Sequence, residues 1–329
     1  MSSLPPFRLS PFFRTRIWGF QNLAPWFDYK TNGEPIGEVW LTGEECVAET
    51  GPNVGQSLRA ITKENSEQVL GPGHEGEEFP LLVKMLFPKE KLSVQVHPDD
   101  ALAQHYGEPR GKTECWYALA AEPGAAVALG LKPGSSEEEI RAAIEAATLE
   151  ELMVWLPVHK GDMIYVDAGT VHAIGPGAVI LETQQTSDLT YRMYDYGRGR
   201  ELHLQKSFEA MRLTTDAGLV APTSEGNRTT LIDARYFRVD RFELGGDGQS
   251  GSNPGANAGA ALALETGEPT PAILFVADGE TTIHGDGFDS FPLSKCQLAV
   301  VPAFSAPWSL DVTGAAEIMR IIPQNIAPQ

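Results

Sequence analysis

The sequence has few cysteines, and no two of them lie close together. Cys46, Cys115 and Cys296 are the only three in 329 residues. A disulfide framework needs an even and denser set, and a thiolate zinc site usually needs a CxxC pair, so neither is expected. This usage is typical of a reducing compartment, which predicts a cytoplasmic protein. Cys115 is expected to pack in the core.

Long apolar runs and excess positive charge are missing as well. No stretch reaches about 18 apolar residues, so no membrane span is expected. Residues 1–6 contain no basic segment and no long apolar segment, so no secretory signal is expected. The chain carries 44 acidic against 25 basic residues, a formal net charge of −19. This charge disfavours nucleic acids and anionic membranes as partners.

Glycine and proline are plentiful, with 33 and 24 residues spread along the chain. Such spacing is typical of many short strands joined by tight turns. Period-two alternation and β-forming composition predict strands in the following segments: 81–87, 92–97, 113–120, 125–130, 163–166, 178–182, 236–244, 273–276, 296–301 and 316–322. The sequence therefore predicts a mostly β protein.

A small helical insert is expected near residues 133–157. Ser136 followed by Glu139 has the spacing of a capping box. The stretch 137–147 is rich in good helix formers, and a second helical turn is expected over 149–156, ending at Pro157. A further helix is expected over 202–211. Asp99 and Asp100 are expected to cap a short helix that begins at Ala101.

The succession of short strands and turns predicts two jelly-roll units. Residues 1–220 form the expected metal-binding catalytic unit, which contains the helical insert. Residues 221–329 form a degenerate unit without a metal, serving packing or dimer contacts. Gly218–Asn227 is expected to be a linker and Gly245–Gly259 a loop, because both are rich in small and polar residues. The expected state is a monomer or a homodimer.

Four side chains have the pattern of a metal site. Gln95 and His97 alternate on one strand face, Glu114 begins a later strand, and His172 ends a glycine-rich turn. A single histidine in a strand is more often packed than ligating. The coincidence of two imidazoles, a carboxylate and an amide oxygen favours one divalent metal with an open coordination position.

The turn before His172 resembles the second cupin motif. Gly161, Asp167, Gly169 and His172 keep its spacing, with Asp167 in place of the usual proline. Gln95 stands where the first cupin motif usually has a histidine. This resemblance implies that the two jelly-roll units are cupin-like.

Longer stretches resemble the type I phosphomannose isomerases, in their short bacterial form. The resemblance extends from about Arg8 to Leu204 and is weak in the C-terminal unit. Its motifs are GEVWLTG (37–43), PLLVKMLFP (80–88), QVHPDD (95–100), GKTECWY (111–117), DAGTVHAIG (167–175) and LETQQTSDLTYRMYDYGR (181–198).

This resemblance implies an enzyme that interconverts mannose 6-phosphate and fructose 6-phosphate with one Zn²⁺ per chain. It also implies functional residues at seven positions. The family's zinc ligands correspond to Gln95, His97, Glu114 and His172, its active-site cations to Lys112 and Arg192, and its second acidic residue to Glu182.

The chemistry of aldose–ketose isomerisation gives each of the last three residues more than one role. The reaction needs a base for the proton on C2, an electrophile and a phosphate anchor. Glu182 is either the base or a residue that orients a ligand. Lys112 either shuttles a proton or binds phosphate. Arg192 either binds phosphate or the enediolate, or forms an ion pair with Asp188 or Asp195.

Two other functions fit parts of the pattern. Two histidines and a carboxylate also suit a non-haem Fe(II) cupin oxygenase. A non-catalytic sugar-binding cupin would keep the pocket without a proton-transfer group. Gln95 as a fourth ligand and the neighbouring cations favour the isomerase over both.

Overall fold

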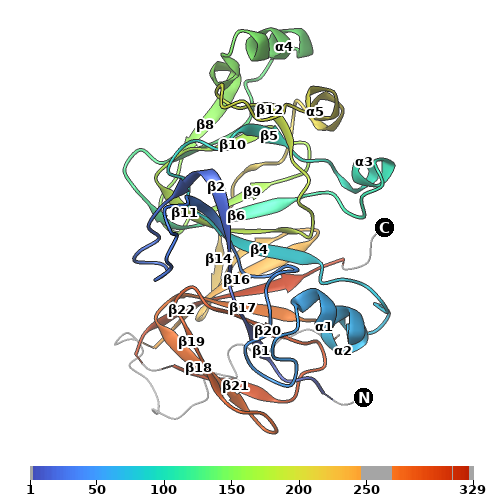
Figure 1. Ribbon diagram of the computed structural model, residues 1–329, viewed down its shortest axis with the longest axis vertical. Helices are drawn as coiled ribbons and strands as arrows, with labels where there is room; N and C mark the ends of the chain where they lie inside the picture. Colours follow the sequence, from blue (N-terminus) through green and yellow to red (C-terminus); the bar gives the residue numbers. More distant parts are fainter. Residues whose placement is uncertain (1–2, 246–268, 313, 326–329) are drawn as a thin grey trace.

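The chain forms two β units that follow one another along the long axis of the molecule (Figure 1). The computed structural model describes residues 3–245, 269–312 and 314–325. Strands dominate and helices are few, which confirms the mostly β, cupin-like prediction. Each unit contains one seven-stranded sheet and one smaller sheet.

The first unit consists of a seven-stranded and a five-stranded sheet, and all of its strand pairs are antiparallel. In spatial order, the larger sheet is β13 (Gly218–Leu219), β9 (Met163–Val166), β6 (Glu114–Ala121), β11 (Ala178–Gln185), β4 (Leu81–Leu86), β3 (Ile36–Trp40) and β2 (Phe12–Phe20). The smaller sheet is β12 (Tyr191–Tyr194), β5 (Val94–Val96), β10 (His172–Ile174), β7 (Ala126–Leu131) and β8 (Met153–Pro157).

The second unit is built in the same way, from a seven-stranded and a three-stranded sheet. The larger sheet is β1 (Phe7–Leu9), β20 (Leu298–Val301), β17 (Ala272–Asp278), β22 (Ala316–Pro323), β16 (Phe237–Leu244), β15 (Arg228–Asp233) and β14 (Thr223–Glu225). The smaller sheet is β19 (Phe291–Ser294), β18 (Glu280–Gly285) and β21 (Trp308–Val312). Because β1 belongs here, the first strand of the chain lies in the second unit; the division at residue 220 stays a prediction.

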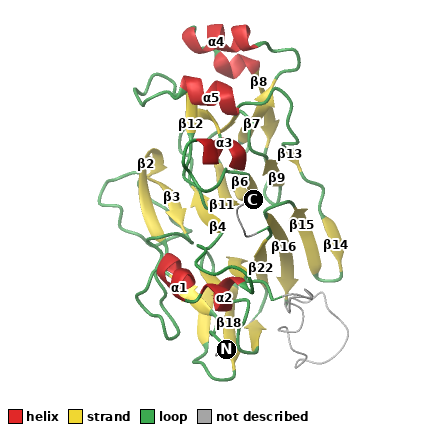
Figure 2. Ribbon diagram, turned by 90° about the vertical axis from the view of Figure 1, so that its right-hand side faces the viewer, coloured by secondary structure: helices red, strands yellow, loops and turns green. Residues whose placement is uncertain are grey.

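Helices lie at the ends and edges of the sheets (Figure 2). They are α1 (Leu58–Glu64), α2 (Ser66–Leu70), α3 (Asp100–His105), α4 (Glu137–Glu145) and α5 (Leu204–Ala210), with the 3₁₀ helix η1 at Leu149–Leu152. The capping box predicted for Ser136 and Glu139 is present at the start of α4. Among the described residues no helix is both long enough and apolar enough to cross a membrane.

One sequence-based prediction about local structure is wrong, and a second segment contains more strand than its composition indicated. The helical turn expected over 149–156 ends at Leu152, and the chain continues directly as strand β8, which pairs with β7. The expected linker 218–227 contains β13 and β14, which pair with β9 and β15. In both places pairing with a distant strand outweighs local composition. Of the loop expected over 245–259, residues 246–259 lie outside the described residues.

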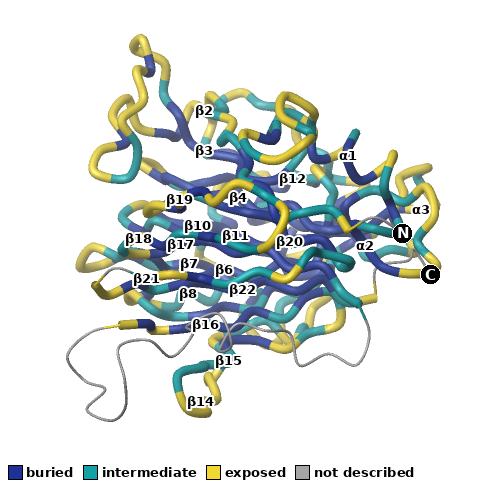
Figure 3. The backbone as a smooth tube through the Cα atoms, turned by 90° about the horizontal axis from the view of Figure 1, so that it is seen from below, coloured by how far each residue is buried: buried dark blue, intermediate teal, exposed yellow. Residues whose placement is uncertain are grey.

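The core follows the alternation of the strands, and the buried backbone runs through the interior of both units (Figure 3). Trp116 and Phe237 are among the largest fully buried side chains. All three cysteines are buried, which confirms the prediction that Cys115 packs in the core. Charged residues are also buried in the first unit, and most of them gather between its two sheets.

Candidate active site

The five-stranded sheet of the first unit carries three of the predicted residues side by side. His172 on β10 lies opposite Gln95 on β5, and Arg192 on β12 lies opposite Gln95 on the other side. His97 follows the last residue of β5. Directly opposed positions in antiparallel strands place their side chains on the same face. This register therefore brings Gln95 next to His172 and Arg192, which follow it in the sequence by 77 and 97 positions.

The seven-stranded sheet supplies the facing wall. Glu114 begins β6, and Glu182 on β11 lies opposite Trp116 on β6 and Lys84 on β4. Lys112 lies two residues before Glu114, at the entrance to β6. The two sheets therefore enclose a cluster of charged and polar groups that come from six different strands and the segments next to them.

The predicted ligand atoms converge. The Nε2 atom of His97 lies 3.6 Å from Glu114 Oε2, and that of His172 lies 3.5 Å from Glu114 Oε1. The ligand atoms of these three residues lie within 4.8 Å of one another. The side-chain amide of Gln95 reaches the same point, with Nε2 at 3.2 Å from His172 Nε2. Rotation of this amide by 180° would present its oxygen to the cluster.

The donor set fits a divalent metal of the zinc type. Glu114 Oε2 is buried and accepts no hydrogen bond within the described chain; Lys112 Nζ lies 3.3 Å away, and the oxygen retains a lone pair that could bind a metal ion. His172 Nδ1 lies 2.9 Å from the carbonyl oxygen of Thr170, which favours the tautomer that leaves Nε2 free to bind a metal.

Burial keeps both imidazoles neutral. It lowers the pKa of His97 well below its ordinary value, and it lowers that of His172 to about 4. A neutral ring retains a lone pair, which a protonated ring lacks. Both histidines are therefore ready to act as ligands at neutral pH.

Lys112 bridges the metal-ligand cluster and Glu182. Its Nζ atom lies 3.0 Å from His97 Nε2, 3.3 Å from Glu114 Oε2 and 4.0 Å from Glu182 Oε1. The side chain is 4 % exposed, so its charge is balanced by these carboxylates rather than by water. The structure thus places Lys112 where the prediction expects it.

Glu182 is the centre of a buried ion-pair network that the sequence analysis did not find. Its Oε1 atom lies 3.0 Å from Lys84 Nζ, and both side chains are 5 % exposed. Burial, aided by the charge of Glu114, raises the pKa of Glu182 in spite of the lysines. Burial acts in the opposite direction on Lys84, but the charges of Glu182 and Glu38 raise the pKa of this lysine on balance.

Glu38 completes this network. Arg16 donates two hydrogen bonds to its carboxylate, at 2.8 and 3.0 Å, and Trp40 Nε1 donates a third at 2.8 Å. Burial opposes ionisation, but the charges of Lys84 and Arg16 and these hydrogen bonds lower the pKa of Glu38 to about 2. Glu38 and Lys84 had one signal in the sequence: each is a charged residue within an otherwise apolar strand.

Arg192 is oriented by neutral groups. Its Nε donates to Ser93 Oγ at 3.3 Å and its Nη1 to the carbonyl oxygen of Glu201 at 2.8 Å. The ion pair considered with Asp188 or Asp195 is not present in this part of the described chain, because Asp195 pairs with Arg198 and Arg200 instead. The guanidinium of Arg192 therefore retains donors for an anion.

One cavity of about 440 Å³ unites most of these groups. Five of the seven predicted residues line it, namely Gln95, Lys112, Glu114, Glu182 and Arg192. Lys84 and Glu38 line it as well, together with Ser93 and Arg200. His97 and His172 lie behind this lining, in contact with Glu114. The cavity thus has the ligand cluster in its wall and arginines at its border.

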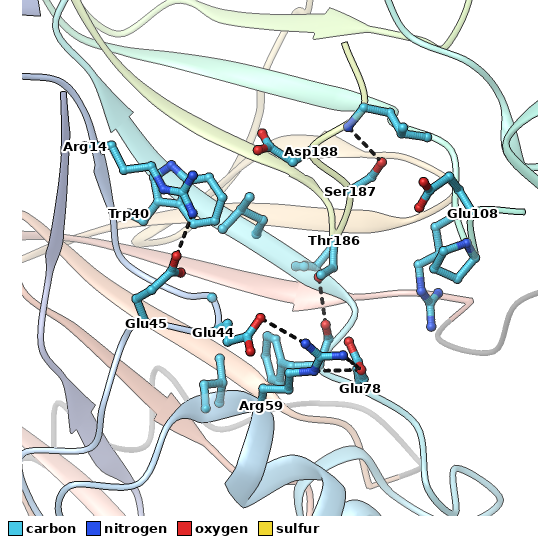
Figure 4. Close-up of a pocket in the computed structure, with 18 residues that line it drawn as sticks. Arg14, Trp40, Glu44, Glu45, Arg59, Glu78, Glu108, Thr186, Ser187 and Asp188 are labelled. Atoms are coloured by element: carbon cyan, nitrogen blue, oxygen red, sulfur yellow. Dashed lines mark hydrogen bonds and ion pairs between the residues drawn. The ribbon is translucent and has the colours of Figure 1, made fainter. Parts of the chain in front are cut away.

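A larger cavity of about 540 Å³ has a different character (Figure 4). Arg14 pairs with Glu45, and Arg59 pairs with Glu44 and Glu78. Asp188 lines both cavities. None of the seven predicted site residues, all of which the structure describes, lines the larger one. Its arginines are largely balanced by glutamates, so the smaller cavity is the candidate active site.

Comparisons with known proteins identify the family of the chain. The family model "phosphomannose isomerase type I, catalytic domain" matches residues 6–130. The mannose-6-phosphate isomerase of Streptococcus mutans is 33 % identical over 320 residues, which cover 93 % of this chain and 95 % of that protein.

Solved structures share the fold over nearly the whole chain. The mannose 6-phosphate isomerase of Bacillus subtilis superposes with a TM-score of 0.81 and 31 % identity, over 96 % of this chain and 99 % of that one. A mannose 6-phosphate isomerase described as bound with zinc and yttrium has a TM-score of 0.71 at 17 % identity, covering 97 % and 99 %. At that identity the likeness concerns the fold alone.

Proposed function

Because the chain belongs to the type I phosphomannose isomerases, we propose that it interconverts mannose 6-phosphate and fructose 6-phosphate in a zinc-dependent reaction through an enediol. One observation supports this most: a single cavity borders the His97, Glu114 and His172 cluster, the buried carboxylate of Glu182 and the free donors of Arg192. These are a Lewis-acid site, a proton carrier and an anion anchor.

Gln95, His97, Glu114 and His172 are the proposed zinc ligands. When bound, Zn²⁺ would supply Lewis acidity toward the carbonyl of the open-chain sugar. Zinc suits this donor set of imidazole, carboxylate and amide oxygen, and it is one of the two ions named for the more distant structure of the same fold. Iron suits a similar set, so the identity of the metal is part of the test.

Glu182 is the proposed carrier of the proton between C2 and C1. As a carboxylate it takes the proton from C2 of the open-chain aldose, and it returns that proton to C1 of the enediol. Its raised pKa suits this task, because a carrier must both accept and release the proton near neutral pH. Lys84 and Lys112, at 3.0 and 4.0 Å, hold the carboxylate in place.

Lys112 is proposed to assist proton transfer between the sugar oxygens on C2 and C1. Isomerisation also moves a proton from the C2 hydroxyl oxygen to the C1 oxygen, so a donor is needed beside the metal site. The ammonium of Lys112 lies against both a ligand histidine and Glu114, at 3.0 and 3.3 Å. This position supports a role for Lys112 at the oxygens and a role for Glu182 at the carbon-bound proton.

Arg192 is the proposed phosphate anchor, with Ser93 and Arg200 beside it at the same cavity. A guanidinium offers paired donors in a plane, which match the oxygens of a phosphate. Such a cationic site is needed because the net charge of −19 repels a phosphorylated sugar. We propose a cytoplasmic enzyme, a monomer or homodimer, whose partner is a phosphorylated hexose.

The test is incubation of the protein with mannose 6-phosphate, either zinc-loaded or stripped with a chelator. We expect fructose 6-phosphate from the loaded protein only, with activity restored when zinc is returned. Mannose without phosphate is the matched control and should react poorly, because it lacks the group that Arg192 would bind.

Two results would contradict the proposal. If the zinc-loaded protein forms no fructose 6-phosphate, it is not this isomerase. If the iron-loaded protein consumes oxygen with the sugar, the oxygenase alternative holds instead. Binding of the sugar phosphate without turnover would favour the non-catalytic cupin.

A further inference from the structure

One carboxylate outside the ligand cluster receives hydrogen bonds from three distant parts of the chain. Asp100 Oδ1 accepts from the backbone N–H of Gly111 at 2.8 Å and from Gln185 Nε2 at 2.9 Å. Asp100 Oδ2 accepts from the hydroxyl of Tyr236 at 2.6 Å. The sequence analysis assigned Asp100 only to a helix end, and it is Asp99 that caps α3.

These bonds hold the segment that carries Lys112 and Glu114. Gly111 immediately precedes Lys112, whose own N–H donates to the carbonyl oxygen of Pro98 at 3.0 Å. Gln185 connects Asp100 to Thr113, because its Oε1 also accepts a hydrogen bond from the N–H of Thr113 at 2.9 Å. Both ends of residues 111–113 are therefore tied to Asp100, once directly and once through Gln185.

The fit between the two segments is close. A Cβ atom on Gly111 would lie 2.5 Å from the carbonyl carbon of Asp99 and 2.6 Å from the nitrogen of Asp100. The segment after His97 and the segment before Glu114 therefore touch through their backbones. A shift of Asp100 is transmitted to Gly111 because there is no space to absorb it.

Tyr236 brings the second unit into this arrangement. It directly precedes β16, in the large sheet of the second unit, and its phenol spans the boundary to Asp100. Burial opposes ionisation of Asp100, but the hydrogen bonds from Tyr236, Gly111 and Gln185 lower its pKa on balance. The carboxylate is thus charged, and charged acceptors form the stronger hydrogen bonds.

We propose that Asp100 and Tyr236 are positioning residues for Lys112 and Glu114, so that the second unit takes part in building the isomerase site. Active-site groups need supporting contacts that fix them within a fraction of an ångström. Asp100 supplies these contacts, and Tyr236 fixes Asp100. The inference rests on the proposed function for its kinetic part only.

The test compares Tyr236→Phe with the control Tyr165→Phe. Tyr165 lines the same cavity of about 380 Å³ as Asp100 and Tyr236, and its hydroxyl has no hydrogen bond within the described chain. We expect Tyr236→Phe to lower kcat for mannose 6-phosphate about threefold to tenfold and to weaken the zinc Kd by up to about tenfold, with KM within twofold. The control should change none of these.

Asp100→Asn and Asp100→Glu test the carboxylate itself. Asp100→Asn removes the charge and one acceptor, so it should lower kcat more than Tyr236→Phe does. Urea unfolding of each variant separates a loss of positioning from a loss of folding. The zinc Kd is measured by competition with a chromophoric chelator, so it remains informative even if the wild-type protein proves not to be an isomerase.

The outcomes are distinct. If Tyr236→Phe and Asp100→Asn both keep kcat and the zinc Kd within twofold of the wild type, the positioning role is wrong. Loss of unfolding stability alone, with unchanged kcat and zinc Kd, would also overturn it, because the bonds would then serve only the fold. Partial recovery of kcat in Asp100→Glu relative to Asp100→Asn would support it.

Discussion

Glu38 is an ionised carboxylate held inside the first unit by Arg16, Trp40 and the charge of Lys84. Its pKa is about 2 in the folded protein, against an ordinary value of 4.5. A carboxyl group with a depressed pKa stabilises the folded state when the pH is above the pKa of the unfolded chain. This stabilisation is lost as the pH falls toward the pKa of the folded protein. At 1.36 kcal/mol per pH unit the full contribution is roughly 3 kcal/mol.

Glu38→Gln should therefore be less stable than the wild type at pH 6. The gap in unfolding free energy should narrow by about 2 kcal/mol between pH 6 and pH 3, because over this range the carboxyl of the unfolded chain takes up a proton while that of the folded protein stays largely ionised. Urea unfolding at several pH values measures the gap. A gap that stays constant across this range would show that the pKa of Glu38 is not depressed.

Glu182→Gln tests the proposal that the carboxylate of Glu182 carries the proton between C2 and C1. Removal of a general base typically costs about 10²–10⁴ in rate, so kcat should fall by that factor, with KM less affected. In the wild type, kcat/KM should decline on the acidic side at a pH above 4.5, because burial raises the pKa of this carboxyl. Zinc content, measured in parallel, should stay at one per chain. A variant that keeps its kcat would remove Glu182 from the chemistry.

The sequence predicted those site residues that local patterns determine. Gln95 and His97 follow from alternation on one strand, and the structure places both at the cluster. Lys84 was missed because its importance comes from its position opposite Glu182, a cross-strand register between residues 98 positions apart. Nothing in the neighbourhood of Lys84 encodes that register, apart from the oddity of a lysine in an apolar strand.

Among the elements, strands with clear alternation were predicted well, and β16 and β22 agree with their predicted ranges to within one residue. The failures share one physical cause. Residues 153–157 and 223–225 have no strong strand pattern of their own, but each lies beside a partner strand that satisfies its backbone hydrogen bonds. Local composition contains no information about that partner.

The segment 110–113 can be tested by the addition of one methyl group at Gly111. Gly111→Ala would place a Cβ atom 2.5 Å from the carbonyl carbon of Asp99, a rigid backbone atom, so the two segments must move apart. We expect at least a tenfold loss of kcat and weaker zinc binding, since Lys112 and Glu114 follow directly. Gly218→Ala is the matched control, because a Cβ atom there meets nothing within 4 Å. Equal kinetics in the two variants would contradict this account.

At the scale of the whole molecule, the two units are joined by pairings that no local pattern reveals. β1, at residues 7–9, pairs with β20, at residues 298–300, so the start of the chain completes a sheet of the second unit. Tyr117 of β6 donates to Glu317 of β22 at 2.9 Å, a second link between the units. The second unit is thus connected to the first both by the chain itself and by a side-chain hydrogen bond.

Zinc binding should raise the unfolding free energy of the protein, and this increase should depend only on ligands in the first unit. A ligand at 100 times its Kd adds about 2.7 kcal/mol to the unfolding free energy, because it binds only the folded state. His172→Ala should abolish this zinc-dependent gain, measured by urea unfolding with and without the metal. His284→Ala should keep it, since that histidine lies in the second unit beside Ser309 and Asp311, outside the one histidine–carboxylate cluster found in the described chain. If the zinc-dependent increase in unfolding free energy is lost in His284→Ala and kept in His172→Ala, the metal binds to the second unit. The roles assigned to the two units would then be reversed.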